Sequence, residues 1–358
     1  MKNMIDLTLL ENWIQQHLPS SSRLTEPMLL DQINSDAGFR QYFRVNSDPT
    51  LIAVLSPPSS ENNTSFVRLS QCFRKNHIRV PLVHAVDYSS GFLLLEDFGD
   101  DLLASSLVSK HAKKFYASAE TELIKIQQIP KNESKCPVYD RELLMAEMDL
   151  FREWFLNRLI KIDLEESDNQ LLDQAFSVIV ESALQQTQVV VHRDFHSRNL
   201  MRLPDNSVGV IDYQDALIGP LTYDVVSLYR DCYIRLPENW VIQKSLDYYR
   251  RAEKLGIAPS ASDKEIISWL DLMGLQRHIK VLGIFSRLHL RDGKHDYLND
   301  LPLVIRYILE QLRPYPKLFN FLEWFECKIL PKVSSQSWYK PWEEAGDSEI
   351  QSNEGFKL

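Results

Sequence analysis

Short β-like runs and two amphipathic helical stretches alternate over the first hundred residues. Apolar side chains recur at helical spacing around residues 4–18 and again over residues 63–76. Runs rich in β-branched, aromatic and leucine side chains predict strands at residues 28–33, 41–45, 51–55, 83–88 and 92–95. The turn residues Ser89, Ser90 and Gly91 separate the last two runs and predict a hairpin. We therefore expect a small sheet with one helix beside it.

Long helical patterns take over from about residue 97. They predict helices at residues 111–128, 140–160, 168–186 and, with prolines as interruptions, from about 222 to 330. One polar region breaks this pattern, and short strands are expected there at residues 189–191, 200–203 and 208–211. The predicted fold class is α+β with two lobes. Its expected parts are a small β-rich lobe at 1–97, a mainly helical lobe at 98–333 and a loosely attached polar tail at 334–358.

Composition narrows the possible partners. The 358 residues carry a net charge of -9, and nucleic-acid binding needs the opposite excess, so no nucleic-acid partner is expected. The four cysteines are scattered singly, which is typical of reduced thiols. No apolar run approaches the ~20 residues that a membrane span needs, and the amino-terminal stretch interleaves polar residues unlike a signal peptide. We expect a cytoplasmic protein with no membrane partner.

The chemistry concentrates in residues 191–215, VHRDFHSRNLMRLPDNSVGVIDYQD. Asp194 leaves a strand on a loop, where a carboxylate can orient a hydroxyl group. Asn199 follows five positions later with an amide oxygen that suits a hard cation. Asp212 closes the apolar run 208–211 and offers a second oxygen ligand. Phosphoryl transfer needs this combination, because it depends on positioning and on neutralising charge at the phosphate oxygens.

The pattern HxDxxxxN, followed by an apolar strand that ends in Asp, resembles the protein-kinase-like phosphotransferases, in particular the aminoglycoside phosphotransferase and choline kinase group. This resemblance implies a protein-kinase-like fold, ATP as phosphate donor and Mg²⁺ as cofactor. It also implies Asp194 as the catalytic residue and Asn199 and Asp212 as the metal ligands. The following segment GPLTYDVVSLYRD is similar to the same group, in which Asp224 would be a structural carboxylate.

The predicted nucleotide lobe departs from the protein-kinase pattern. Its hairpin, SDAGFRQYFRV, has one glycine, the next strand has no lysine, and the helix at 63–76 has no glutamate. Small residues in the hairpin let backbone amides approach phosphates, and arginine binds phosphate bidentately. The segment LLLEDFGD resembles the hinge whose backbone pairs with adenine. The candidate nucleotide-binding residues are thus Ser35, Gly38, Arg40, Arg44, Glu96 and Phe98.

The segments that carry these departures resemble those of the bacterial anomeric kinases, which phosphorylate N-acetylmuramate and N-acetylglucosamine at C1 in cell-wall recycling. The similar segments are DAGFRQYFRV, the lysine-free strand with its SPP, LLLEDFGD, VHRDFHSRNLM and GVIDYQDALIGPLTYDVVSLYRD. Gly38 and Gln41 are substitutions in the family's hairpin, and Ser56 begins the run that is DAPP-like in the family. The implied partner is a small-molecule acceptor, an amino sugar.

Three alternatives stay open. A kinase for another small alcohol, such as choline, homoserine or an aminoglycoside, would share the same chemistry. The missing strand lysine also allows a catalytically silent nucleotide-binding protein. His192, Asp194 and His196 form an HxDxH pattern that zinc hydrolases use, but Arg193 and Arg198 lie beside it and no second His/Asp cluster follows. The pattern does not define the oligomeric state.

Overall fold

The chain forms two compact units in the computed structural model. One unit comprises Met1–Leu103 together with Asn199–Asp215, and the other comprises Ala104–Arg198 together with Ala216–Leu358. The structure describes residues 7–33, 38–106, 112–348, 350 and 356. The lobe limits expected from the sequence, 1–97, 98–333 and 334–358, stay predictions. No helix in the described part of the chain has the length and apolar character that a membrane crossing requires.

A five-stranded antiparallel sheet forms the centre of the first unit. Its strand order is β2-β3-β5-β7-β6. The strands are β2 (Leu30–Ile33), β3 (Gln41–Val45), β5 (Leu51–Leu55), β6 (Val83–Asp87) and β7 (Phe92–Glu96). Every residue of β5 is buried, which indicates that both faces of the sheet are covered at this strand. Two further two-residue strands, β1 (Arg23–Leu24) and β4 (Ser47–Asp48), pair with each other.

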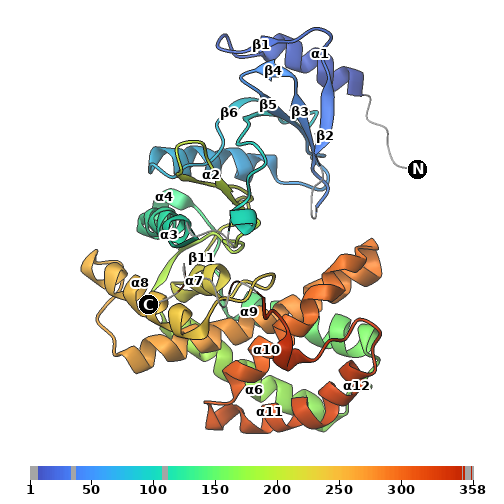
Figure 1. Cartoon of the computed structure of the whole chain (residues 1–358), viewed down its shortest axis with the longest axis vertical. Coiled ribbons are helices and arrows are strands. Elements are labelled where there is room, and N and C mark those ends of the chain that lie inside the picture. The colour runs from blue at the N-terminus through green and yellow to red at the C-terminus, as the bar shows by residue number, and fades with distance from the viewer. Residues whose placement is uncertain (1–6, 34–37, 107–111, 349, 351–355, 357–358) are drawn as a thin grey trace. The chain divides into compact units, whose positions relative to one another are not determined.

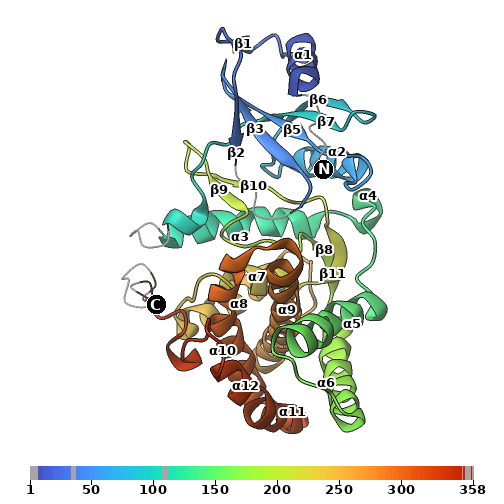
Figure 2. The same ribbon diagram turned by 90° about the vertical axis from the view of Figure 1, so that its right-hand side faces the viewer.

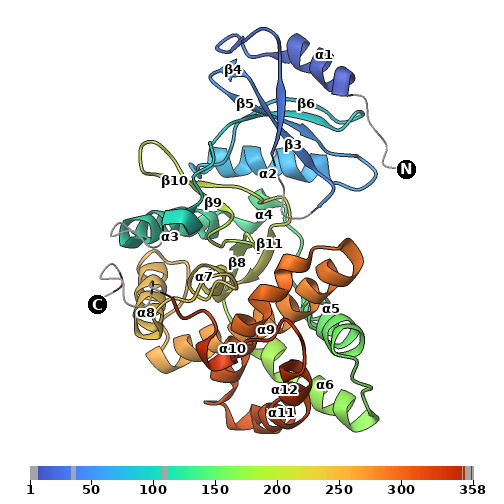
Figure 3. The same cartoon turned by 45° about the vertical axis from the view of Figure 1, so that its right-hand side comes forward.

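Helices cover the two faces of this sheet. Helix α1 (Leu7–His17) packs Leu10 and Ile14 against the face that carries Leu51, Ala53 and Leu55. Helix α2 (Asn63–Lys75) lies on the opposite face, as the views in Figures 1 and 3 agree. Asn62 caps α2 by accepting the Ser65 N–H at 2.9 Å. The expected sheet and both predicted helices are confirmed, but one helix was expected beside the sheet and two cover it.

The later segment of the first unit is a short hairpin, β9 (Leu200–Arg202) with β10 (Val208–Val210). Its backbone is tied to the amino-terminal part of the unit, because Val210 N–H donates to the Arg79 carbonyl at 2.8 Å. Met201 and Leu203 pack against Phe98. A Cβ on Gly209 would lie 2.5 Å from the Phe98 ring, so only glycine permits this contact.

The second unit is mainly helical. Its helices are α3 (Ala112–Gln128), α4 (Lys131–Ser134), α5 (Arg141–Leu150), α6 (Glu166–Gln185), α7 (Thr222–Tyr229), α8 (Glu238–Lys254), α9 (Asp263–Asp292), α10 (Leu301–Leu312), α11 (Phe319–Trp324) and α12 (Leu330–Ser334). Helix α9 contacts α5, α6, α7, α8 and α10 and is the central helix of the unit (Figure 2). A capping box at Ser262 and Glu265 begins it, and Gly293 in left-handed conformation ends it. Helix α5 continues into a π-helical segment, Phe151–Leu159, where one helix was expected over 140–160.

A two-stranded sheet interrupts these helices. Strand β8 (Gln188–Val191) pairs antiparallel with β11 (Leu217–Pro220), with Val191 opposite Leu217. The sequence predicted β8 but not β11, because Gly219 and Pro220 are turn-forming residues. A Cβ on Gly219 would lie 3.0 Å from the Val191 side chain, so the glycine provides room for the pairing. The pairing fixes the end of β8, from which the HRDFH loop starts.

The described residues after 334 contact the helical unit. Ala345 packs with Leu303 and Tyr307, and Arg306 forms an ion pair with Asp347 at 2.8 Å. Phe356 is buried against Trp240 and Tyr116. These contacts order the described part of the segment predicted to be a tail.

Candidate active site

Asp194 lies on the loop that follows β8 in the helical unit, and its side chain is 43% exposed. The preceding residue, Arg193, has φ 78°, a left-handed conformation that costs about 1–3 kcal/mol for a non-glycine residue. The strained residue turns the chain directly before the candidate catalytic carboxylate. Such strain persists only where the surroundings hold it, and it occurs mainly at functional sites.

Asp224 holds this turn in place. It lies on α7, is fully buried, and accepts the His192 N–H at 2.6 Å and the Arg193 N–H at 3.0 Å. Burial raises the pKa of Asp224 to about 7, although these two N–H donors and Arg277 act in the opposite direction. Asp224 is therefore a structural carboxylate, as the resemblance implied.

Positive charge surrounds Asp194. The Arg277 guanidinium lies 3.8 Å from its Oδ1, and Arg277 itself is only 3% exposed. Burial acts to raise the pKa of Asp194, but the nearby charges, first Arg277 and then Lys280, outweigh it and hold the pKa at about 2. The carboxylate is therefore ionised at neutral pH. It is a weak base, suited to accepting a hydrogen bond from a hydroxyl group.

A buried network supports the loop from below. Glu147 on α5 pairs with Arg193 and accepts a hydrogen bond from Tyr139, and Lys280 lies 2.9 Å from it. Gln276 donates to the Tyr139 hydroxyl at 3.0 Å. The Arg193 side chain is thereby paired with Glu147, and its charge also favours the ionised Asp194 carboxylate.

The remaining loop residues are also tied down. His192 is buried, and its Nδ1 accepts the Asp194 N–H at 3.3 Å. His196 packs edge-on against Tyr233. Ser197 donates both its N–H and its hydroxyl to Asp231, at 3.0 and 2.6 Å. The described residues contain no cluster of three or more His, Cys, Asp or Glu side chains suited to a metal.

Asn199 and Asp212 come together in the first unit. The register of the β9–β10 hairpin places Ile211 beside Asn199, and the Ile211 N–H donates to the Asn199 carbonyl at 3.1 Å. Asn199 Nδ2 lies 3.4 Å from Asp212 Oδ2. Asp212 has φ 64° and is exposed. One carboxylate and one amide oxygen fit Mg²⁺, which takes few protein ligands and fills its shell with phosphates and water.

The hairpin before β3 carries a buried arginine. Gly38 has φ 103°, which favours glycine, while Ser35 lies outside the described residues. Arg40 is 7% exposed, pairs with Glu61 at 3.0 Å, and donates from Nε to the Ser56 hydroxyl at 3.2 Å. The Glu61 carboxylate also accepts the Phe39 N–H at 3.1 Å. It therefore contacts the hairpin at the Arg40 side chain and at the Phe39 backbone.

Arg40 also shares its surroundings with the metal-ligand candidate. Burial raises the pKa of Tyr42 to about 12, with the charges of Arg40 and Asp212 both acting on it. A cation and a carboxylate thus act on the same tyrosine, beside the hairpin expected to cover the phosphates.

Arg44 has a different environment. It lies on β3 and pairs with Asp97 at 2.7 Å and with Asp100 at 2.8 Å, both in the connector after β7. Its guanidinium therefore joins the sheet to the connector. Its expected role at phosphate stays a prediction.

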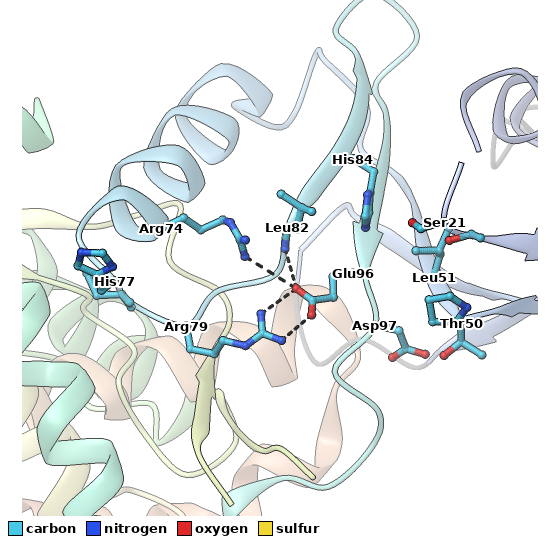
Figure 4. A pocket seen from close by; sticks show the side chains of 13 residues that line it. Ser21, Thr50, Leu51, Arg74, His77, Arg79, Leu82, His84, Glu96 and Asp97 are labelled. Atoms are coloured by element: carbon cyan, nitrogen blue, oxygen red, sulfur yellow. Dashed lines mark hydrogen bonds and ion pairs between the residues drawn. The ribbon is translucent and has the colours of Figure 1, made fainter. Parts of the chain in front are cut away.

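Glu96 ends β7 directly before this connector, and Phe98 lies within it. The Glu96 N–H donates to the Leu82 carbonyl at 2.9 Å, and its carboxylate accepts from Arg79 at 2.8 and 2.5 Å. Phe98 is buried beneath the Arg79 guanidinium. Figure 4 shows Arg74, Arg79 and the Leu82 N–H directed at Glu96. Arg74, Arg79, Leu82 and Glu96 line a cavity of about 670 Å³, whose lining residues do not include Phe98, Gly38 or Arg40.

The sequence did not single out the supporting residues Glu61, Glu147, Arg277 and Lys280. A signal for the last two was present, since they interrupt the apolar stretch around MGLQRHIKVLGIF. Charged residues inside a buried helix are rare unless they are paired or functional. Glu147 and Glu61 carried no such signal, because each belongs to an ordinary polar pattern.

Comparison with known proteins places these features in context. Residues 30–255 match the phosphotransferase enzyme family. The N-acetylmuramate/N-acetylglucosamine kinase of Pseudomonas putida is 37% identical over 290 residues, 81% of this chain and 85% of the relative. The kinase of the same name from Pseudomonas aeruginosa is 38% identical over 293 residues, 82% of this chain and 86% of the relative. An ADP-bound aminoglycoside phosphotransferase superposes with a TM-score of 0.56 at 15% identity, over 86% of this chain and 99% of that chain, which confirms the predicted fold class.

Asp224→Asn should remove a pH dependence of stability. The pKa of Asp224 is higher in the folded than in the unfolded chain, so its contribution to stability is full below about pH 4 and is lost as the pH rises through 7. The difference in free energy of unfolding between wild type and D224N should therefore shrink between pH 5 and 7, by at most about 1.4 kcal/mol per pH unit. Urea unfolding at several pH values measures it.

Asp205→Asn is the matched control for this measurement. Asp205 is exposed in a turn, and hydrogen bonds from Ser207 lower its pKa, so the D205N difference should stay flat above pH 5. A D224N difference that is constant or grows with pH would contradict the assigned role of burial.

Proposed function

This chain belongs to the phosphotransferase enzyme family, and we propose that it transfers the γ-phosphate of ATP to the anomeric hydroxyl of N-acetylmuramate or N-acetylglucosamine. Such a reaction would make amino sugars available for reuse during cell-wall recycling. It would take place in the cytoplasm, where ATP is available. One observation carries the proposal: two relatives of 37% and 38% identity, aligned over four fifths of the chain, both bear the name of this kinase.

ATP is the proposed donor. Family membership supports it, as does the ADP carried by a protein of the same fold. We assign the phosphates to the hairpin at Gly38 and to Arg40, with Ser35 as a further backbone donor. Glu61 then takes the part that a helix glutamate plays beside the usual strand lysine, because it holds the buried arginine in position.

The connector is the proposed adenine site. The Glu96 N–H is already used within the sheet, so we assign recognition of the adenine edge to the remaining backbone groups of Glu96 and to those of Phe98. Arg44 supports this site indirectly, through its ion pairs with Asp97 and Asp100. Phe98 is held by its contacts with Met201 and Leu203.

Magnesium is the proposed cofactor. Asn199 and Asp212 would hold it, and when bound it would neutralise the charge that develops on the phosphate oxygens. Gln214 donates to Asp212 Oδ1 at 2.8 Å and so orients the carboxylate. The remaining steps of the mechanism use side chains of the chain itself.

Asp194 is the proposed catalytic residue. It accepts a hydrogen bond from the acceptor hydroxyl, whose oxygen attacks the γ-phosphorus as the bond to the β–γ bridging oxygen breaks. The proton passes to Asp194 late, because a carboxylate of pKa about 2 is a weak base. An anomeric hydroxyl is more acidic than an ordinary alcohol, so weak base assistance suits this acceptor.

An acceptor panel with ADP release as the readout tests the function. N-acetylmuramate and N-acetylglucosamine should support turnover, whereas choline, homoserine and an aminoglycoside should not. The methyl glycoside of N-acetylglucosamine is the matched control, because its anomeric oxygen is blocked, and it should be inert. Turnover with the methyl glycoside would move the reaction to another hydroxyl, and silence with every acceptor despite ATP binding would favour the catalytically silent protein.

Asp194→Ala should lower kcat by about 10²–10⁴-fold, because removal of the group that orients and accepts the proton acts on the transition state. ATP affinity should change less than two- to threefold. Steady-state kinetics and calorimetric titration with ATP measure the two quantities. A variant with wild-type turnover would refute the catalytic assignment.

Asp212→Ala should weaken ATP binding and the response to magnesium together. Loss of one of two proposed protein ligands should raise the Mg²⁺ concentration needed for half-maximal activity about tenfold or more. The control is Asp215→Ala, an exposed carboxylate nearby in the sequence. An unchanged magnesium response in D212A would exclude this ligand.

A further inference from the structure

Arg277 is buried in an unusual way. Two other buried arginines of the helical unit have close carboxylate partners: Arg230 pairs with Asp271 at 2.7 Å, and Arg235 with Glu310 at 2.8 Å. The carboxylate partner of Arg277 among the described residues is Asp194, at 3.8 Å. Its Nε has no hydrogen-bond partner in the described part of the chain. Burial of a guanidinium with so loose an ion pair is a poor way to stabilise a fold.

The contacts that Arg277 does make are directed at the catalytic loop. Its Nη1 donates to the Arg193 carbonyl at 2.8 Å and lies 3.5 Å from the Tyr223 hydroxyl. The Arg193 carbonyl belongs to the peptide that joins Arg193 to Asp194. One guanidinium therefore fixes the backbone before Asp194 and attracts its carboxylate at the same time.

The other charged groups facing Asp194 are engaged elsewhere. Lys280, also on α9, and Arg193, on the loop, both pair with Glu147 of α5. Asp224 of α7 accepts the backbone N–H groups of His192 and Arg193. His196, which also acts on the pKa of Asp194, lies on the same loop as Asp194. Arg277 is thus the cation whose charge no other carboxylate of the described residues neutralises at close range.

Resting on the proposed phosphotransfer, we infer that Arg277 is a positioning residue, which sets the orientation of the Asp194 carboxylate toward the acceptor hydroxyl. The loose 3.8 Å contact is part of this role. At this distance Arg277 does not form the close bidentate pair that would hold both carboxylate oxygens. The 43% exposure of the Asp194 side chain agrees with contact to an acceptor hydroxyl.

Arg277→Met and Arg277→Lys test the inference in the full-length protein. R277M should lower kcat about 10- to 100-fold and change the KM for ATP less than twofold, because a displaced catalytic group affects the chemical step. R277K should recover part of the loss, since lysine restores the charge but not the guanidinium geometry that places Nη1 on the Arg193 carbonyl. Arg230→Lys, the same change at another buried arginine, should keep kcat within twofold.

A double variant separates positioning from general structural support. If Arg277 acts through Asp194, then R277M/D194A should be no slower than D194A alone, within twofold. Losses that multiply in the double variant, or a wild-type kcat in R277M, would overturn the inference. If R277M does not fold, R277K with R277K/D194A gives the same comparison.

Failure of the proposed function is distinguishable from failure of this inference. If no acceptor supports turnover of the wild type, the proposed function fails. The contact between Arg277 and Asp194 is then tested through stability, without substrate. The urea midpoints of wild type, R277K, D194A and the double variant form a cycle whose non-additivity supports the contact and whose additivity contradicts it.

Discussion

The loop that carries Asp194, the proposed catalytic residue, depends on one buried carboxylate. Asp224 accepts two successive backbone N–H groups, and this is what allows Arg193 to keep a left-handed conformation that its side chain disfavours. The loop then leaves β8 with Asp194 turned outward and half exposed. Without an acceptor at this place, two buried N–H groups would be unsatisfied, which is costly in a protein interior.

Charge in the helical unit is arranged around that loop. Helix α9 is buried along most of its length and yet carries Arg277 and Lys280 in its interior. Glu147 pairs with Lys280, and Asp194 is the described carboxylate nearest to Arg277. These charges favour the ionised form of Asp194, the proposed catalytic residue, so the same buried charges serve the fold and the proposed chemistry.

The sequence predicted the elements well where local pattern decides them. Strands β3 and β5 lie at the expected residues, because alternating and continuous apolar runs identify strands within a sheet. Strand β11 was missed, since its Gly219 and Pro220 are explained only by the close packing with Val191. The π-helical segment after α5 was missed too, because its periodicity barely differs from that of a helix.

The residues of the candidate site also fall into those that local sequence could predict and those that it could not. Asn199 and Asp212 were predictable as a pair, since a two-stranded hairpin brings the residues flanking it together. The partners of Arg277 and Glu61 were not predictable, because each residue meets its partner through tertiary packing that no local spacing encodes, even though the charge of Arg277 stands out within an apolar stretch. Motifs reveal the groups that perform chemistry, whereas the groups that hold them come from distant segments.

The membership of residues 199–215 in the first unit has an evolutionary consequence. The chain leaves the helical unit after Arg198 and returns at Ala216, so a single recombination point near residue 103 would not transfer the first unit intact. The exchanged piece would lack the hairpin that buries Phe98 and would leave that ring exposed. Exchange of this unit between related enzymes therefore requires that both segments be replaced together.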